Sequence, residues 1–264
     1  MLDSSEPYII DYFGFGKAEN GASVRWVANG HRTHATGLLP LNRCRHLGSP
    51  WESKKVEQVI LRMLAACSRV VQVVAQPHSL YVGLRGIKRQ LRYTPDIEVM
   101  AHSSLRDELA SGRPLFEIVA EPFPRTIAQD EVVPIVLELK SDRDEKVNDP
   151  VERTRMGIFS KVYEHVGLDF FTLMQGRHID SNFTALLTDL EAGAHDRVGN
   201  VEKSLCNLAF GSARTLSFGH LSAALGGQPR GERMVKALHM KGFISIDLRR
   251  GLNHEAPVWL MQRR

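Results

Sequence analysis

Two strand-like segments that carry charged residues constrain the fold more than any other feature of this sequence. Asp96 follows residues 93–95, Tyr-Thr-Pro, and Glu138 lies forty-two residues further on, at the end of the apolar run 132–137. Apolar β-forming residues surround both segments, so we expect two strands. Side chains two residues apart in a strand point to the same face, so Glu138 and Lys140 should project together.

Two carboxylates and an ammonium are the groups that a metal-dependent phosphodiesterase needs. Asp96 and Glu138 offer the oxygen ligands that Mg²⁺ prefers, the Leu139 carbonyl is a possible further ligand, and Mn²⁺ should substitute. The metal would lower the pKa of a bound water, and Lys140 would position that water or stabilise developing charge. The pattern resembles the PD-(D/E)xK nuclease superfamily. The alternative is a salt bridge on the solvated face of an edge strand, and residues 52–54, Glu-Ser-Lys, also fit the Glu-x-Lys part of the pattern.

The segments upstream of Asp96 add a helix and two strands. Residues 51–57 should open a helix whose apolar residues recur at helical spacing up to Leu64. A β-rich strand over residues 69–77 should end at Pro77, and a second strand should lie near residues 80–82. Glu57 would then lie near the start of the helix, at the border of its apolar stripe.

In this order, the motifs resemble the nuclease domain of the TnsA-type endonuclease subunit of heteromeric transposases. The resemblance covers roughly residues 45–175, and its most telling pieces are Glu57, Gln76-Pro77, residues 92–96 and residues 138–140. It implies that Glu57 is a third acidic residue of the site and a metal ligand, and that Gln76 supports the site. Glu52 competes with Glu57 for this role, and the alternative for Glu57 is a solvent-facing charge on a helix.

The resemblance implies an α/β fold over residues 1–190, with a restriction-endonuclease-like mixed sheet flanked by helices. Residues 151–167 should form a helix with Ile158, Val162 and Val166 on one face, followed by a strand over residues 169–174. The stretch 102–134 is longer than expected between the two site strands, and it is an inserted hairpin or a helix-loop segment.

Charge is unevenly distributed along the chain, although the net charge is only +4. Residues 17–92 carry thirteen Lys or Arg against three acids, and residues 93–190 carry ten against eighteen. A basic segment that holds phosphates and an acidic segment that holds cations suit a nuclease. Four basic residues lie together in a predicted hairpin that would face DNA: Arg85, Lys88, Arg89 and Arg92. The alternative is an ordinary solvated turn.

Residues 191–264 are predicted to form a second domain after a linker at residues 190–195. Three helices are expected, over residues 201–210, 218–225 with Ser217 as the N-cap, and 230–241, followed by two strands over residues 243–248 and 258–261. This order is typical of a winged-helix domain. Its candidate DNA-binding residues are Arg230, Arg233 and Lys236 on the third helix, and Arg249 and Arg250 between the strands. The alternatives are docking onto a protein partner, or a helical cap that touches no DNA.

By the resemblance, the chain is a Mg²⁺-dependent DNA endonuclease that cuts one strand at each transposon end. Its expected partners are double-stranded DNA, a DDE-type transposase and an AAA+ ATPase regulator. The other interpretations are a non-enzymatic winged-helix DNA-binding protein with a degenerate nuclease domain, and a stand-alone restriction or repair nuclease.

Composition fits a protein with no membrane association. The 264 residues contain no run of about 18 apolar residues, and the first residues lack the features of a secretory signal. The three cysteines, Cys44, Cys67 and Cys206, have neither zinc-site nor disulfide spacing. A reducing cytoplasm is therefore the expected compartment, and the expected host is a prokaryote.

Overall fold

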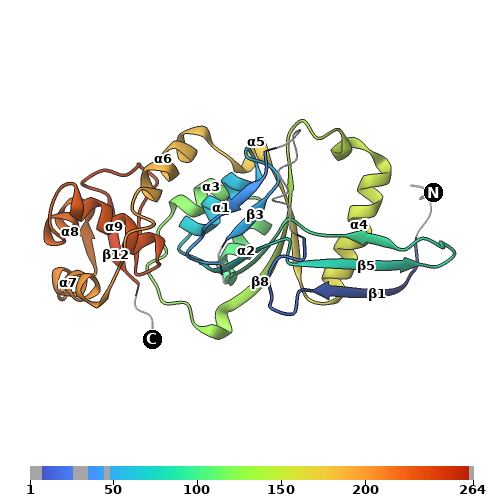
Figure 1. Ribbon diagram of the computed structural model, residues 1–264, viewed down its shortest axis with the longest axis horizontal. Coiled ribbons are helices and arrows are strands. Elements are labelled where there is room, and N and C mark those ends of the chain that lie inside the picture. Colours follow the sequence, from blue (N-terminus) through green and yellow to red (C-terminus); the bar gives the residue numbers. More distant parts are fainter. Residues whose placement is uncertain (1–7, 26–34, 45–47, 262–264) are drawn as a thin grey trace.

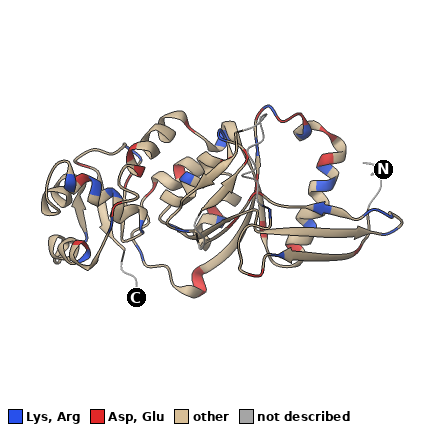
Figure 2. Cartoon of the chain, viewed as in Figure 1, with Lys and Arg blue, Asp and Glu red and all other residues tan. Residues whose placement is uncertain are grey.

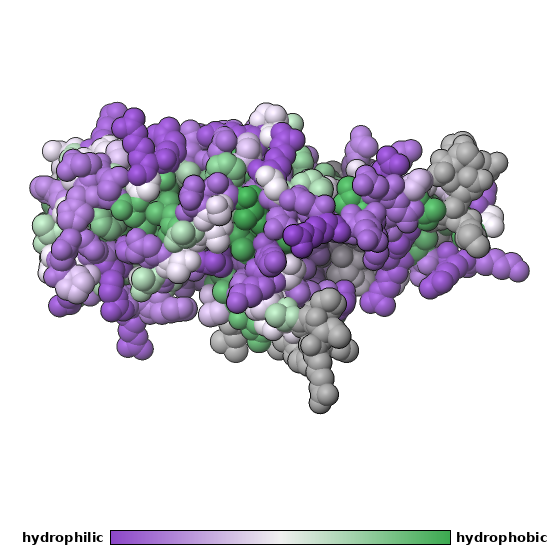
Figure 3. Space-filling view, turned by 90° about the horizontal axis from the view of Figure 1, so that it is seen from above, coloured by the Kyte–Doolittle hydropathy of each residue, from purple (hydrophilic) through white to green (hydrophobic). Residues whose placement is uncertain are grey.

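The computed structural model describes residues 8–25, 35–44 and 48–261, in which helices and β-sheets alternate along the chain (Figure 1). The α/β class expected from the sequence is confirmed. Among the helices in these three ranges, none is both long and apolar enough to cross a lipid bilayer. The face shown in Figure 3 is mostly hydrophilic, and hydrophobic residues show on it as separate patches.

Four strands form the central sheet, in the order β4-β7-β8-β9. Their bounds are β4 Val70–Ala75, β7 Ile97–His102, β8 Val132–Lys140 and β9 Asp169–Met174. β7 is antiparallel to both of its neighbours, whereas β9 is parallel to β8. A parallel pair needs a crossover, which helix α4 (Pro150–His165) provides after the 3₁₀ turn η2 (Glu145–Asn148).

A second sheet, of order β1-β5-β6, contains β1 (Ile10–Lys17), β5 (His78–Leu84) and β6 (Leu91–Tyr93) and lies beside α4 (Figure 1). This second sheet and helix α4 share a small hydrophobic core with β8. Its members include Leu80, Val82, Val136, Ile158, Phe159 and Val162. The buried face predicted for the helix is thus confirmed at Ile158 and Val162. The prediction is wrong at Val166, which is exposed because the helix has ended at His165.

The main hydrophobic core lies between the central sheet and a group of helices that includes α1. The helices are α1 Glu57–Ala66, α2 Ser103–Ala110, α3 Leu115–Ala120 and α6 Ser181–Glu191. Shorter elements are β2 Gly37–Leu39, β3 Ser49–Trp51, η1 Gln129–Glu131 and α5 Gln175–His178. The long stretch 102–134 is therefore a helix-loop segment, since α2, α3 and η1 all lie within it.

The helix predicted to open at residues 51–57 begins later than expected. Trp51 belongs to β3 and pairs with Gly37, and its ring is held in the core, so the chain arrives at this point as a strand. A turn follows, in which Ser53 Oγ accepts a hydrogen bond from Val56 N–H at 3.3 Å. The helix therefore starts at Glu57, and the pattern of its apolar residues correctly predicted the rest.

The C-terminal segment contains three helices and a three-stranded antiparallel sheet of order β10-β12-β11. The elements are α7 Asn200–Phe210, β10 Thr215–Ser217, α8 Phe218–Ala224, α9 Arg230–Met240, β11 Ile244–Ile246 and β12 Pro257–Leu260. The three predicted helices and two predicted strands are confirmed, with β10 as an unpredicted addition. Ser217 caps α8 as expected, because its side chain accepts a hydrogen bond from His220 N–H.

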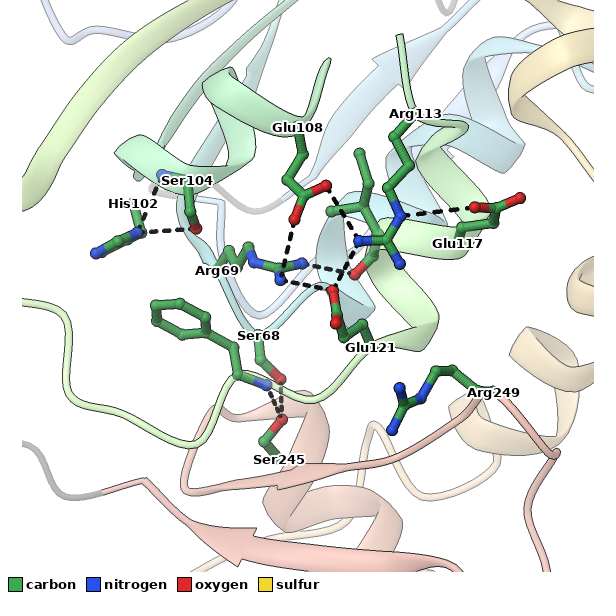
Figure 4. A network of polar contacts seen from close by, with 12 residues as sticks. Ser68, Arg69, His102, Ser104, Glu108, Arg113, Glu117, Glu121, Ser245 and Arg249 are labelled. Carbon is green, nitrogen blue, oxygen red and sulfur yellow. Dashed lines mark hydrogen bonds and ion pairs between the residues drawn. The ribbon is translucent and has the colours of Figure 1, made fainter. Parts of the chain in front are cut away.

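This segment lies directly against the rest of the chain (Figure 1). One continuous hydrophobic core includes residues of both. The hydroxyls of Ser68 and Ser245 form a hydrogen bond of 2.8 Å, and Ser245 Oγ also accepts a hydrogen bond from Phe123 N–H (Figure 4). Leu248 N–H donates to the Ala120 carbonyl at 2.8 Å. The helical segment between β7 and β8 is therefore the platform on which the C-terminal segment rests.

The predicted linker at residues 190–195 is partly buried, with Ala192 and His195 as its exposed positions. Leu190 is the penultimate residue of α6 and is fully buried, and Ala194 is buried as well. The Ala194 carbonyl accepts a hydrogen bond from the Asn42 side chain at 3.2 Å. Further exposed positions follow the predicted linker, at Arg197 and Gly199.

Candidate active site

The register of β7 and β8 brings the two predicted carboxylates together. Ile97 lies opposite Leu137 in this antiparallel pair, so Asp96, just before β7, reaches the end of β8. The Asp96 carboxylate accepts a hydrogen bond from Leu139 N–H at 2.7 Å. The sequence therefore correctly predicted that residues forty-two positions apart are neighbours.

Glu138 and Lys140 project to the same face of β8, as the two-residue period predicts. Lys140 Nζ lies 2.8 Å from Glu138 Oε1, and the Tyr93 hydroxyl donates to Glu138 Oε2. β8 is an inner strand between β7 and β9, and Glu138 is only 7 % exposed. A salt bridge on the solvated face of an edge strand is therefore excluded.

Glu57 approaches this site from the first turn of α1, where it is half-buried. Its carboxylate accepts a hydrogen bond from Glu52 N–H at 2.6 Å, and burial raises its pKa above the ordinary value. Glu52 is directed elsewhere, because it forms an ion pair with Arg25 at 2.7 Å. Of the two competing glutamates, the structure brings Glu57 to Asp96, since the Glu57 charge is one of those that raise the Asp96 pKa.

Negative charge exceeds positive charge around Asp96. Burial, and then the charges of Glu138 and Glu57, raise the pKa of Asp96 well above its ordinary value. The hydrogen bond from Leu139 N–H and the Lys140 ammonium act in the opposite direction without cancelling the effect. A cation placed here would offset the uncompensated charge.

Gln76 supports the same site through its backbone. It has φ of 49°, a conformation rare outside glycine, and its N–H donates to the Asp96 carbonyl at 2.7 Å. Its side-chain oxygen is buried and has no hydrogen-bond partner within the described residues. An unsatisfied buried oxygen is costly, and it marks a place where a ligand or ion would gain a contact.

The donors suit Mg²⁺ in chemical type, but in this arrangement they do not converge on one point. Carboxylate and carbonyl oxygens are the ligands that hard divalent cations take. Within residues 8–25, 35–44 and 48–261, however, no group of three or more His, Cys, Asp or Glu is placed to hold a metal ion. Glu138 is engaged by Lys140 and Tyr93, and Glu57 by a backbone amide.

A buried aromatic and histidine cluster behind Glu138 was not predicted from the sequence. Tyr93 stacks on Phe159, with ring centroids 4.7 Å apart, while it donates to Glu138. Behind it, Tyr163 Oη lies 2.8 Å from His78 Nε2, and both side chains are fully buried. Tyr93 adjoins the Pro-Asp motif, but the tertiary contact that gives it a role leaves no periodic signal in the sequence.

The predicted basic hairpin forms between β5 and β6, and Lys and Arg gather at its tip (Figure 2). Arg85, Lys88 and Arg89 are exposed there. Arg92 is held more firmly, since its guanidinium lies over the Tyr81 ring at 5.5 Å and donates to Ser79 Oγ. The hairpin is confirmed as an exposed cationic surface, while DNA contact stays a prediction.

The basic residues predicted on α9 are less available. Lys236 is buried and pairs with Asp189 of α6 at 2.6 Å, so its assignment to DNA contact is wrong in this arrangement. Arg233 pairs with Asp196 at 2.6 Å. Most of α9 is buried because it packs between α8 and the helices α1 and α6.

The remaining predicted cations of the C-terminal segment are exposed. Arg230 and Arg250 have no ion-pair partner in the part of the chain that is described, whereas Arg249 forms a two-bond pair with Asp247. Arg249 also borders a cavity of about 460 Å³, lined by Phe116, Phe183 and other residues of α3, α6 and the β11–β12 connection. That cavity is not part of the carboxylate site, because it contains none of the site residues.

No protein-family model matches the chain, and no curated protein matches it. The chemistry of the site residues is therefore the basis on which a function can be inferred.

Proposed function

We propose that this chain is a metal-dependent DNA endonuclease and the strand-cleaving subunit of a heteromeric transposase. One observation carries the proposal: the β7–β8 register joins Asp96 to the backbone of Leu139, beside the buried Glu138–Lys140 pair. Burying a charge is costly unless it is paired with an opposite charge, and here the buried negative charge exceeds the positive charge. Such an imbalance is typical of a functional site.

In this proposal the acidic residues hold the ion and the lysine acts on the phosphate. After Glu138 and Glu57 exchange their present partners for the ion, Asp96, Glu138, the Leu139 carbonyl and Glu57 would bind Mg²⁺, which would supply a bound water of lowered pKa and neutralise phosphate charge. Burial lowers the pKa of Lys140, but the charge and hydrogen bond of Glu138, with the charges of Asp144 and Asp96, together raise it above its ordinary value, so Lys140 is an ammonium. It stabilises negative charge on the phosphoryl oxygens.

The architecture proposed for the chain has two parts. Residues up to 190 supply a restriction-endonuclease-like sheet flanked by helices, and residues 191–264 supply a winged helix. Three helices and a three-stranded antiparallel sheet in the order α7-β10-α8-α9-β11-β12 support the second assignment.

We infer that the winged helix serves a protein partner more than DNA. Helix α9 is largely buried, whereas α7 exposes a row of apolar side chains at helical spacing: Val201, Leu205 and Leu208, the last of them 76 % exposed. Exposed apolar rows of this kind suit a protein contact, and the AAA+ ATPase regulator is the partner that the resemblance implies. The DDE-type transposase would cut the other strand.

Nicking of supercoiled DNA in Mg²⁺ tests the proposal, with and without transposase and ATPase on DNA that contains transposon ends. We expect weak cutting by the chain alone and site-specific cutting in the mixture. Asp96→Asn keeps an oxygen acceptor for Leu139 N–H and removes the charge, so it should fold and fail to cut.

Three results would change the assignment. Full activity of Asp96→Asn would refute the nuclease site. Site-specific cutting by the chain alone would favour a stand-alone restriction or repair nuclease. DNA binding with no cutting under any of these conditions would favour a degenerate nuclease domain.

A further inference from the structure

A second cleft opens beside the carboxylate site. It has a volume of about 590 Å³ and is lined by residues 52–56, residues 141–143, Ala35 and Gln175. None of these residues is assigned a function above, although residues 52–54 match the Glu-x-Lys pattern in sequence. In the structure, residues 52–54 lie apart from Asp96 and Glu138, and Lys54 lines the cleft.

The walls of the cleft are continuous in the chain with the elements that carry the site. One wall, residues 52–56, runs directly into Glu57 at the start of α1. The other, residues 141–143, directly follows Lys140 at the end of β8. Gln175 follows Met174, which pairs with Lys140 in the β8–β9 register. The cleft is therefore built from the residues that adjoin Glu57 and Lys140 in the chain.

Three cations line the cleft, and they are not neutralised within it. Lys54, Lys55 and Arg143 are exposed, and none pairs with a carboxylate among the residues whose positions are described. The two acids that also line the cleft have other partners than these three cations. Glu52 pairs with Arg25 at 2.7 Å, and Asp142 accepts a hydrogen bond from Gly176 N–H at 2.9 Å.

We propose that this cleft binds the phosphodiester backbone of DNA next to the phosphate that is cut. The inference rests on the proposed nuclease function and names the part of the chain that holds its substrate. Lys54 and Lys55 from one wall and Arg143 from the other contact consecutive phosphates. Because phosphate contacts carry no sequence information, this binding is independent of sequence, and a partner subunit selects the site.

The test measures DNA affinity with Ca²⁺ in place of Mg²⁺, over a series of salt concentrations, using the full chain and a duplex of fixed length. Lys54→Ala/Lys55→Ala removes two phosphate contacts. The slope of log affinity against log salt should then fall by about 1.8, because each contact contributes about 0.9. At 0.1 M salt this corresponds to a loss of affinity on the order of 10- to 60-fold. Arg143→Ala should lower the slope by about 0.9 more.

Two control variants show whether charge alone explains the effect. Arg197→Ala/Arg214→Ala removes the same charge from exposed positions of the C-terminal segment, outside the cleft, and should leave the slope near the parent value. Lys54→Arg/Lys55→Arg should restore the parent slope. The proposal is overturned if the Lys54/Lys55 variant keeps the parent slope, if both Ala pairs lower it equally, or if the parent chain does not bind DNA.

Asp96→Asn separates failure of the cleft from failure of the nuclease assignment. If this variant binds DNA but does not cut while the lysine variant keeps the parent slope, the cleft proposal falls and the nuclease stands. If Asp96→Asn still cuts DNA, the nuclease assignment falls, and the salt slopes still decide whether the cleft binds phosphates.

Discussion

Acid should destabilise this protein through His239, which lies where α9 meets α1 and the C-terminal sheet. The side chain is 1 % exposed, its Nδ1 accepts a hydrogen bond from Ile246 N–H at 3.2 Å, and its Nε2 has no hydrogen-bond partner among the described residues. Burial, with the Arg43 charge nearby, lowers the pKa of His239 from its ordinary 6.5 to about 3. The ring is therefore neutral in the folded protein at neutral pH.

Acid destabilises the folded state because the unfolded chain binds a proton at His239 more readily than the folded chain does. Above pH 6.5 neither the folded nor the unfolded chain protonates this ring, so stability is full. As the pH falls from 6.5 towards 3, the unfolded chain takes up the proton and the folded chain does not. The free energy of unfolding should drop by roughly 1.4 kcal/mol per pH unit, and so by about 3 kcal/mol at pH 4.5.

Urea unfolding at pH 7.5, 6.5, 5.5 and 4.5 measures this, with His239→Asn as the comparison. Asparagine keeps an acceptor for Ile246 N–H and cannot titrate, so the variant should be less stable by a fixed amount and lose less stability in acid. His220→Asn, at an exposed position of α8, should follow the parent protein. Parallel losses in the parent and in His239→Asn would refute the reasoning.

Three shorter predictions concern the site and the junction. Tyr93→Phe removes a hydrogen bond to the Glu138 carboxylate, which is worth about 1.5–3 kcal/mol, so DNA nicking should slow by roughly 10- to 150-fold; an unchanged rate would deny Tyr93 a positioning role. Lys140→Ala should slow nicking but retain Mg²⁺ binding, as measured by calorimetry. A large loss of Mg²⁺ affinity in this variant would refute the role of Lys140 on the phosphate. Trypsin should cut first at exposed Arg197, and the two fragments should stay associated in gel filtration because a continuous core joins them.

Local sequence patterns predicted the elements well because apolar periodicity and caps determine them. The strand at residues 169–174 and the helix that begins at Pro150 follow from such signals. The start of α1 was missed because Trp51 belongs to a strand pair with Gly37, a contact between distant residues. For the same reason, propensity could not show that Lys236 would be buried against α6.

Prediction of the site from the sequence was likewise limited to what local patterns determine. A strand period of two predicts that Glu138 and Lys140 share a face, and antiparallel pairing then brings Asp96 to them. The hydrogen bond from Tyr93 and the pairing of Glu52 with Arg25 depend on how separate elements pack, so they could not be predicted from motif spacing.

The segment between β7 and β8 links the site strands to the C-terminal segment. Arg69, just before β4, donates to the Ile118 carbonyl and pairs with Glu121 at 2.9 Å, and Glu121 also pairs with Arg113 (Figure 4). This network fixes α3 to the central sheet, and the Ala120 carbonyl at the end of α3 accepts the hydrogen bond from Leu248. β7 and β8 therefore emerge from the same segment that supports the C-terminal helices, so a partner that moves those helices acts on a body connected to Asp96 and Glu138 through both strands.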